Sequence, residues 1–208
     1  VQTCALPIYP DKLKFNAGTP IPTDILWYGA NKNKGLGVFS YGKYKLRLLD
    51  DHNVDLKIIL PIAVTGGSRD LTLFAIWAYN PQDRGYNYIG QIWKAIHHYE
   101  NLLKGKNIIM AGDFNSNVMW DKLHRKSNHS MVVEKLSNLN IFSTYHTHLN
   151  CTQGLEAHPT YFLYRHLNRP YHIDYCFASK EFSDKLSDYK YEFYKDLAEL
   201  WRGVILKH

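Results

Sequence analysis

The tetrapeptide Gly112-Asp113-Phe114-Asn115 combines the residue types and spacing best suited to catalysis in this sequence. The pattern of residues 107–111 predicts a strand buried on both faces, and catalytic groups favour the loops at the carboxyl ends of such strands. Gly112 permits a sharp turn. If the chain stays extended, Asp113 and Asn115 point to one side, because side chains alternate along a strand. Such a carboxylate and carboxamide are able to hold a water molecule and a metal-bound phosphate.

The same tetrapeptide also suits a simple turn, because Gly, Asp and Asn are favoured in turns for backbone reasons alone. Two other segments shift the balance toward a site. Residues 71–81 are a second apolar run, which ends in Tyr79-Asn80-Pro81, and residues 172–177 are a short aromatic run with Asp174 in its middle. A charged carboxylate buried in such a strand is costly unless it is paired. We therefore expect Asp174 to have a fixed partner.

Together these segments resemble the endonuclease/exonuclease/phosphatase superfamily, which includes abasic-site endonucleases, DNase I and inositol polyphosphate 5-phosphatases. Gly112-Asp113-Phe114-Asn115 is similar to the family's Gly-Asp-(Phe/Leu)-Asn signature, and Ile173-Asp174-Tyr175 is similar to its (Arg/His)-Ile-Asp-Tyr signature. The two motifs occur in the family's order, with Tyr79-Asn80-Pro81 upstream. The resemblance covers residues 9–178. It implies an α/β fold, a four-layered sandwich of two packed, mainly antiparallel sheets flanked by helices.

The resemblance also implies roles for individual side chains. Asp113 would orient or deprotonate the attacking water, and Asn115 would hydrogen-bond a nonbridging phosphate oxygen or the nucleophile. Tyr79 would reach the phosphate, and Asp174 would fix the tautomer of a catalytic histidine. A strand-end aromatic and a carboxylate bonded to backbone are the structural alternatives for Tyr79 and Asp174. The other expected substrate-binding residues are Asn80 and Arg165.

The reaction that these roles serve is phosphodiester hydrolysis by in-line attack of water. Mg²⁺ is the expected cofactor, with Mn²⁺ as the alternative, because Mg²⁺ is a hard ion that uses few carboxylates and keeps several waters. Zinc is not expected, since no Cys or His pairs have the spacing of a tetrahedral site. A net charge of +6 favours a nucleic-acid substrate. Two alternatives stay open: a phosphatase of a small-molecule or phospholipid phosphoester, and a non-catalytic polyanion-binding homologue.

The two ends of the chain depart from the family's pattern. Family members carry an Asn or Asp and a metal-binding Glu before the matched part, and a Ser-Asp-His triplet after it. This chain opens with residues 1–8, which resemble a translated sequencing adapter, and closes with Leu206-Lys207-His208. We therefore expect residues 1–8 to be an artefact and residues 9–208 to be a single domain truncated at both ends, with the metal ligands outside the chain. As a fragment it is expected to be inactive, and His208 is not assigned the role of the catalytic histidine.

Length and composition fit one folded domain, with 208 residues of which 45% are hydrophobic. No apolar run reaches the roughly 18 residues of a membrane-spanning helix. Three cysteines are too few for a disulfide framework, which fits a reducing compartment. We expect a cytoplasmic protein with no obligate protein partner.

The hydrophobic pattern predicts elements that would position these residues. Residues 35–39 and 44–49 predict a hairpin, and closely spaced strands with short turns predict antiparallel pairing. Helical spacing of apolar residues predicts three helices. The predicted strands are residues 56–64, 71–79, 107–111, 141–144, 159–162 and 173–178, and the predicted helices are residues 86–104, 131–139 and 192–206.

Overall fold

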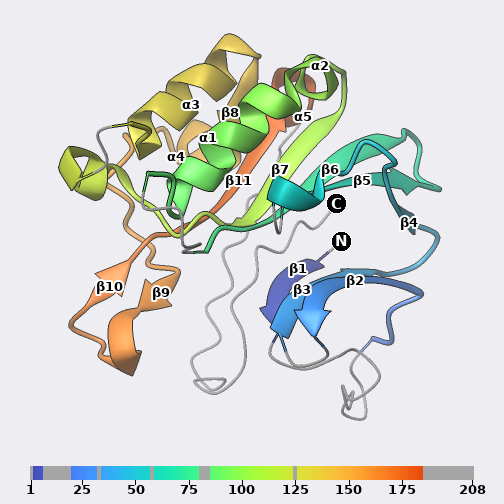
Figure 1. The fold of residues 1–208 in the computed structure, drawn as a ribbon, viewed down its shortest axis with the longest axis horizontal. Coiled ribbons are helices and arrows are strands. Elements are labelled where there is room, and N and C mark those ends of the chain that lie inside the picture. Colours follow the sequence, from blue (N-terminus) through green and yellow to red (C-terminus); the bar gives the residue numbers. More distant parts are fainter. Residues whose placement is uncertain are drawn as a thin grey trace.

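A six-stranded sheet is the centre of the structure, a computed structural model that describes residues 2–6, 20–31, 34–56, 59–79, 85–123 and 126–184. Its strand order is β4-β5-β6-β7-β11-β8 (Figure 1). All neighbouring pairs are antiparallel except β6 and β7, which are parallel and are joined through helix α1, as a parallel crossover requires. The strands are β4 (Lys45–Leu48), β5 (Ile59–Thr65), β6 (Leu71–Trp77), β7 (Ile108–Asp113), β8 (Ile141–Ser143) and β11 (Asp174–Ser179).

Helices cover one face of this sheet (Figure 1). They include α1 (Ile89–His98), α2 (Glu100–Leu103) and α3 (His129–Asn138), while α4 (Thr144–Leu149) follows β8. Asn128 caps α3, since its side chain accepts a hydrogen bond from the backbone N–H of Met131 at 2.9 Å. The buried residues between helices and sheet include Phe74, Ile76, Met110 and Phe177 from the strands and Ile92, Ile96, Val132 and Leu136 from the helices.

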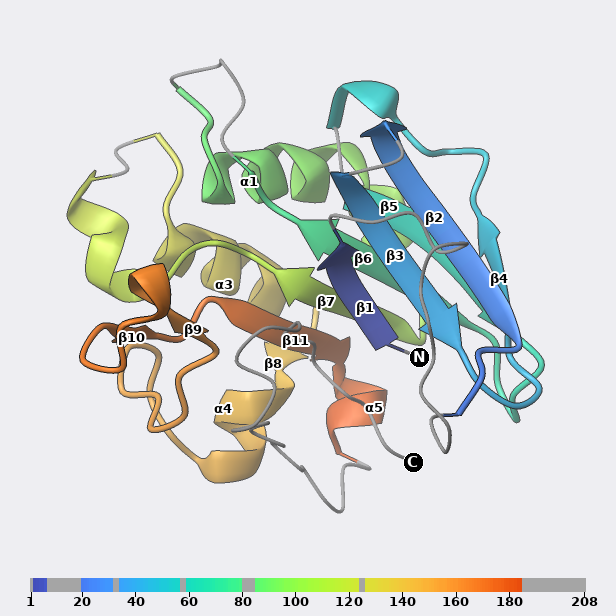
Figure 2. The ribbon, with the colours of Figure 1, turned by 90° about the horizontal axis from the view of Figure 1, so that it is seen from below.

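A three-stranded sheet lies on the other face (Figure 2). Its order is β1-β3-β2, with β1 (Gln2–Leu6), β2 (Asp24–Asn31) and β3 (Lys34–Ser40), and both pairs are antiparallel. The core between the sheets includes Leu36, Val38, Leu60, Leu73, Ala111 and Cys176. The expected α/β sandwich is thereby confirmed, and the described residues form three of its layers. Because Gln2–Leu6 pairs with β3, part of the suspected artefact forms a strand, and its adapter origin stays a prediction.

The predicted hairpin of residues 35–39 and 44–49 is wrong. β3 pairs with β1 and β2, whereas β4 pairs with β5 in the six-stranded sheet. The turn at Gly42, whose φ is 72°, therefore carries the chain from one sheet to the other. Burial gives the physical reason: β3 is buried at every position after Lys34, whereas β4 alternates between exposed and half-buried residues, as an edge strand does.

The helix predicted over residues 86–104 is divided into α1 and α2. At the junction Tyr99 has φ −93° and ψ 17°, and its buried side chain accepts a hydrogen bond from the backbone N–H of Asn53 at 2.8 Å. The expected pair of Glu100 and Lys104 is present at 2.9 Å. The helix predicted over residues 192–206 lies outside the described residues. In the described part of the chain, no helix is both long and apolar enough to cross a membrane.

Gly112 closes the end of β7 against β6. Its φ is 137°, and a Cβ at this position would lie 2.0 Å from the backbone oxygen of Ile76, its neighbour in the parallel ladder. The backbone of the sheet cannot move away without breaking this ladder. Only glycine fits here, and the close approach of β7 to β6 determines the position of Asp113.

Gly112→Ala is therefore expected to reduce the free energy of unfolding by on the order of 4 kcal/mol, measured by denaturant titration. Gly42→Ala is the matched control. Gly42 also has positive φ, but its Cβ would meet nothing within 4 Å, so only the backbone strain of about 1 kcal/mol is expected. Equal losses for the two variants would show that the close approach to Ile76 is not the cause.

Candidate active site

Three strand ends meet at one edge of the six-stranded sheet. β6 and β7 are parallel and end together, and β11 begins there because it runs antiparallel to β7. The register places Trp77 beside Asp113 and Asp113 opposite Asp174. Directly opposed residues have Cβ atoms about 5 Å apart. The structure thus brings together the two carboxylates that the sequence motifs singled out.

Both carboxylates face the space between the two sheets. Ala111 and Cys176 belong to the core between the sheets. Asp113 and Asp174 each lie two positions away from one of them along the same strand, so their side chains point to the same face. The site therefore lies where this core reaches the sheet edge.

The opposed carboxylates disfavour each other's charge. The pKa of Asp113 is raised well above its usual value, first by burial and second by the nearby charge of Asp174, and the backbone N–H of Asn115 offsets only part of this. An arrangement of this kind favours a proton or a cation next to the pair. Asp113 is consequently better suited to accepting a proton than an ordinary surface carboxylate.

Asn115 reaches Asp113 through a turn and not through an extended strand, so that premise of the sequence prediction is wrong. Its φ is 49°, and its backbone N–H donates to Asp113 Oδ1 at 2.7 Å. Its side-chain Nδ2 donates to the carbonyl of Ala78 at 3.2 Å and lies 3.4 Å from Asp113 Oδ2. The turn alternative is thus right about the backbone, while the side chains still converge.

Tyr79 follows β6 at the same edge. Its neighbour Ala78 donates its backbone N–H to the carbonyl of Asp113 at 2.8 Å. The pKa of Tyr79 is raised by burial, so its hydroxyl stays protonated and able to donate a hydrogen bond. Of the other expected substrate-binding residues, Asn80 and the side chain of Arg165 lie outside the described residues.

Trp77 and Lys34 were not predicted as site residues. The Trp77 ring lies 5.9 Å from the ring of Tyr79, and Lys34 Nζ lies 5.3 Å from the Trp77 ring centroid. The sequence contained a signal for Trp77, because it lies two positions before Tyr79 in the same apolar run. Lys34 comes from the other sheet, so only the tertiary structure places this cation here.

Thr160 holds the start of β11 in place. Its Oγ1 accepts hydrogen bonds from the backbone N–H groups of Ile173 at 2.9 Å and Asp174 at 3.0 Å. The carbonyl of Ile173 in turn accepts the backbone N–H of Phe114 at 3.0 Å. These contacts connect the Asp174 segment directly to the turn that carries Asp113.

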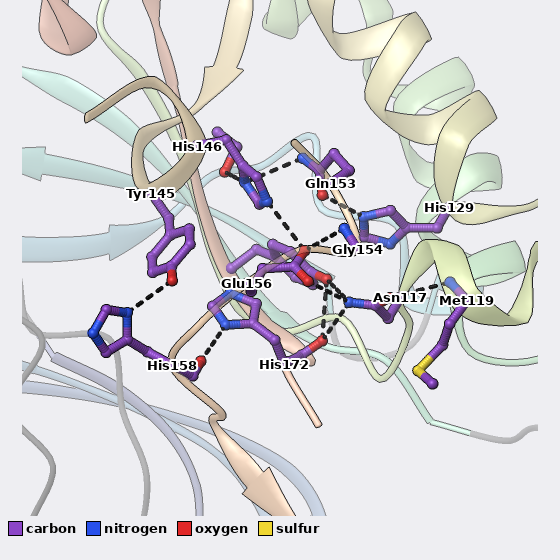
Figure 3. A network of polar contacts seen from close by, with 12 residues as sticks. Asn117, Met119, His129, Tyr145, His146, Gln153, Gly154, Glu156, His158 and His172 are labelled. Atoms are coloured by element: carbon purple, nitrogen blue, oxygen red, sulfur yellow. Dashed lines mark hydrogen bonds and ion pairs between the residues drawn. The ribbon is translucent and has the colours of Figure 1, made fainter. Parts of the chain in front are cut away.

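A buried polar network lies next to this segment (Figure 3). Its members are Asn117, His129, His146, Gln153, Glu156, His172 and Tyr175. Sequence reasoning missed it, because the residues are dispersed and form no motif. Within the described part of the chain, no group of three or more His, Cys, Asp or Glu side chains is placed to hold a metal ion.

No protein-family model matches the sequence, and no curated protein matches it. Solved structures are similar in fold. A 3′ phosphatase, NExo from Neisseria bound to a product DNA hairpin, has a TM-score of 0.52 and 15% identity, over 86% of this chain and 76% of that chain. The 3′–5′ exonuclease NExo from Neisseria meningitidis has a TM-score of 0.51 at the same identity and coverage.

The endonuclease domain of TRAS1, a telomere-specific non-LTR retrotransposon, has 17% identity and a TM-score of 0.44. The match covers 76% of this chain and 65% of that domain, so the chain spans just under two thirds of its length. The architecture and the NExo structures show that the chain has the fold of the endonuclease/exonuclease/phosphatase superfamily, the DNase I-like fold.

Asp113→Asn is expected to raise the melting temperature at pH 7. Because the pKa of Asp113 is raised in the folded state, the native protein binds this proton more tightly than the unfolded chain does. Stability therefore falls as the pH rises from the ordinary value of 3.8 to the raised value. The amide avoids this loss, and the gain should disappear near pH 3, where Asp113 is protonated in both states.

Glu100→Gln is the control of opposite sign. Glu100 is half-buried, and its pKa is lowered to about 2 by Lys104 and Lys135, so neutralising it should not stabilise the protein at pH 7. A melting temperature of Asp113→Asn at or below that of the wild type at pH 7 would contradict the strain at the carboxylate pair.

Proposed function

We propose that the protein is a metal-dependent phosphoester hydrolase that cleaves phosphodiesters in nucleic acid. The observation that carries this proposal is the pairing of Asp113 with Asp174 across neighbouring strands, with Asn115 and Tyr79 at the same sheet edge. The DNase I-like fold supports it, since NExo, described as a 3′ phosphatase and a 3′–5′ exonuclease, has the same fold.

Each side chain at the edge suits one requirement of the reaction. Asp113, with its raised pKa, would accept a proton from the attacking water. Asn115, anchored to Ala78, would orient that water or a nonbridging phosphate oxygen. Tyr79 would donate its hydroxyl hydrogen to the phosphate, because its raised pKa keeps it protonated. Asp174 would orient a catalytic histidine and fix its tautomer, as the family resemblance implies.

Mg²⁺ is the proposed cofactor, with Mn²⁺ as the alternative. The like charges of the opposed residues Asp113 and Asp174 favour a cation close to the pair. Mg²⁺ needs few protein carboxylates, because it commonly keeps several waters and takes further oxygens from a substrate phosphate. When bound, the ion would neutralise charge on the phosphate and on the leaving oxygen.

A nucleic-acid substrate is favoured by the surface that leads to Asp174. The hairpin of β9 (Tyr161–Phe162) and β10 (Pro170–Tyr171), joined through η4 (Leu163–Arg165), ends three residues before Asp174. It projects from the body of the fold (Figure 1), and the side chain of Tyr164 in η4 is 75% exposed. Exposed aromatic rings stack on unpaired bases, and the net charge of +6 favours the phosphate backbone.

Turnover tests the catalytic part of this proposal. Asp113→Asn is expected to lower kcat by at least about a hundredfold with the fold retained, because shape is kept and the base is lost. Asn115→Ala should be impaired less. Hydrolysis of bis-p-nitrophenyl phosphate with Mg²⁺ and with EDTA is the measurement. Binding of DNA without any Mg²⁺-dependent turnover would instead favour the non-catalytic polyanion-binding alternative.

Substrate class is tested by Tyr164→Ala. If the hairpin contacts bases, this variant should lower kcat/KM on DNA by about tenfold and leave bis-p-nitrophenyl phosphate hydrolysis unchanged. Ile21→Ala is the matched control, since Ile21 is equally exposed, at 75%, and lies three residues before β2 of the three-stranded sheet. Faster hydrolysis of an inositol phosphate or a phospholipid than of DNA would point to the small-molecule or lipid alternative.

A further inference from the structure

The buried polar network lies on the opposite face of β11 from the carboxylate pair. Tyr175 packs in the core between the sheet and the helices, whereas Asp174, its neighbour in sequence, faces the space between the sheets. A single strand thus separates the two sets of polar groups. Any movement of Tyr175 therefore moves Asp174 as well.

Asn117 connects the network to both sides of Asp174. It follows the Asp113 turn and is 4% exposed. Its Nδ2 lies 3.1 Å from the carbonyl of His172 and 3.0 Å from the hydroxyl of Tyr175, and its Oδ1 accepts the backbone N–H of Met119 at 3.1 Å. His172 and Tyr175 flank Asp174 in sequence. The carboxamide of Asn117 therefore holds the start of β11, which carries Asp174, against the segment that carries Asp113.

Glu156 holds Asn117 in turn. The side chain of Glu156 is only 3% exposed, and its carboxylate accepts from Asn117 Nδ2 at 3.2 Å and from the backbone N–H of Gly154 at 3.0 Å. His146 Nε2 lies 3.1 Å away (Figure 3). Burial would raise the pKa of Glu156, but these contacts outweigh it and lower the pKa to about 2. The carboxylate is thus ionised and fully occupied as an acceptor at neutral pH.

The histidine side of the network is fixed by β8 and the loop after α4. His146 Nδ1 lies 2.7 Å from Ser143 Oγ and 3.2 Å from Gln153 Nε2. Gln153 Oε1 lies 3.2 Å from His129 Nε2, and burial lowers the pKa of His129 to about 4. The chain of contacts from Asn117 therefore ends on regular secondary structure, which makes it rigid.

We propose that Asn117 and Glu156 are positioning residues that hold Asp174 opposite Asp113. Two like charges on neighbouring strands repel each other, so the first residues of β11 would separate from β7 unless they were held. Thr160 holds the backbone of Asp174 from the hairpin side, and Asn117 holds its two flanks from the helix side. The catalytic consequence rests on the proposed function, whereas the geometric one does not.

The geometric part is tested in the 208-residue chain by following the carboxyl titrations of Asp113 and Asp174 with ¹³C NMR. In Asn117→Ala and Glu156→Ala the pKa of Asp113 is expected to fall toward its ordinary value, because Asp174 moves away and water enters. Glu156→Gln should keep most of the shift, since its amide oxygen still accepts from Asn117. Asn128→Ala, which removes the cap of α3, is the control that destabilises the fold without touching β11.

The catalytic part is tested by measuring kcat and KM. Asn117→Ala should lower kcat by about tenfold to a hundredfold with KM within about twofold, because misplacement of a catalytic group acts on the chemical step. Asn128→Ala should leave both constants unchanged. Glu156→Gln, which keeps the acceptor, should recover most of the activity that Glu156→Ala loses.

The outcomes separate the two proposals. An unchanged Asp113 titration in both alanine variants would overturn the positioning role, whatever the activity. Loss of the raised Asp113 pKa in the alanine variants, together with a wild-type protein that hydrolyses no phosphoester, would support the positioning and refute the proposed function. If Asn117→Ala does not fold, Glu156→Ala and Glu156→Gln decide the question, because a difference in titration between them depends on the acceptor at this position.

Discussion

The opposition of Asp113 and Asp174 across β7 and β11 is the constraint on which the rest of the site depends. Two half-buried carboxylates on neighbouring strands repel each other, and each loses hydration, so the arrangement is unfavourable by itself. Contacts in the surrounding structure hold the two carboxylates in place despite this repulsion. Gly112 brings β7 close to β6, Asn115 donates to Asp113, and Thr160 holds the backbone of Asp174. The fold thereby maintains strain at this carboxylate pair.

The two faces of β11 contact different parts of the structure. One face continues the core between the sheets and ends in Asp174, and the other carries Tyr175 into the buried polar network. The position of β11 is well fixed, because residues 174–178 pair with β7 and residues 177–179 pair with β8. The network on the helix face therefore determines the site on the sheet face without contacting a substrate, as supporting shells do in other sites built on rigid elements.

The local hydrophobic pattern was sufficient to predict most strands and helices, but it was not sufficient to predict which strands pair. Strands β5, β6, β7 and β11 and helix α3 were predicted from hydrophobic spacing, since this spacing reflects the faces that each element buries. The pairing of β3 and β4 was predicted wrongly, because partner choice depends on contacts between distant segments. The break between α1 and α2 was missed for the same reason, as Tyr99 bonds to Asn53.

The sequence by itself predicted which residues would carry the chemistry, since Asp113, Asn115 and Asp174 stand in short motifs that resemble a family's signatures in their order, and these roles stay predictions. It also determined the fold class, through these motifs and the resemblance they carry. Only the tertiary structure decided that Asn117 meets Tyr175 and Glu156 and that Lys34 meets Trp77. These partners are distant in sequence, and a hydrogen bond or a ring contact depends on distance and direction in space, which no local spacing records.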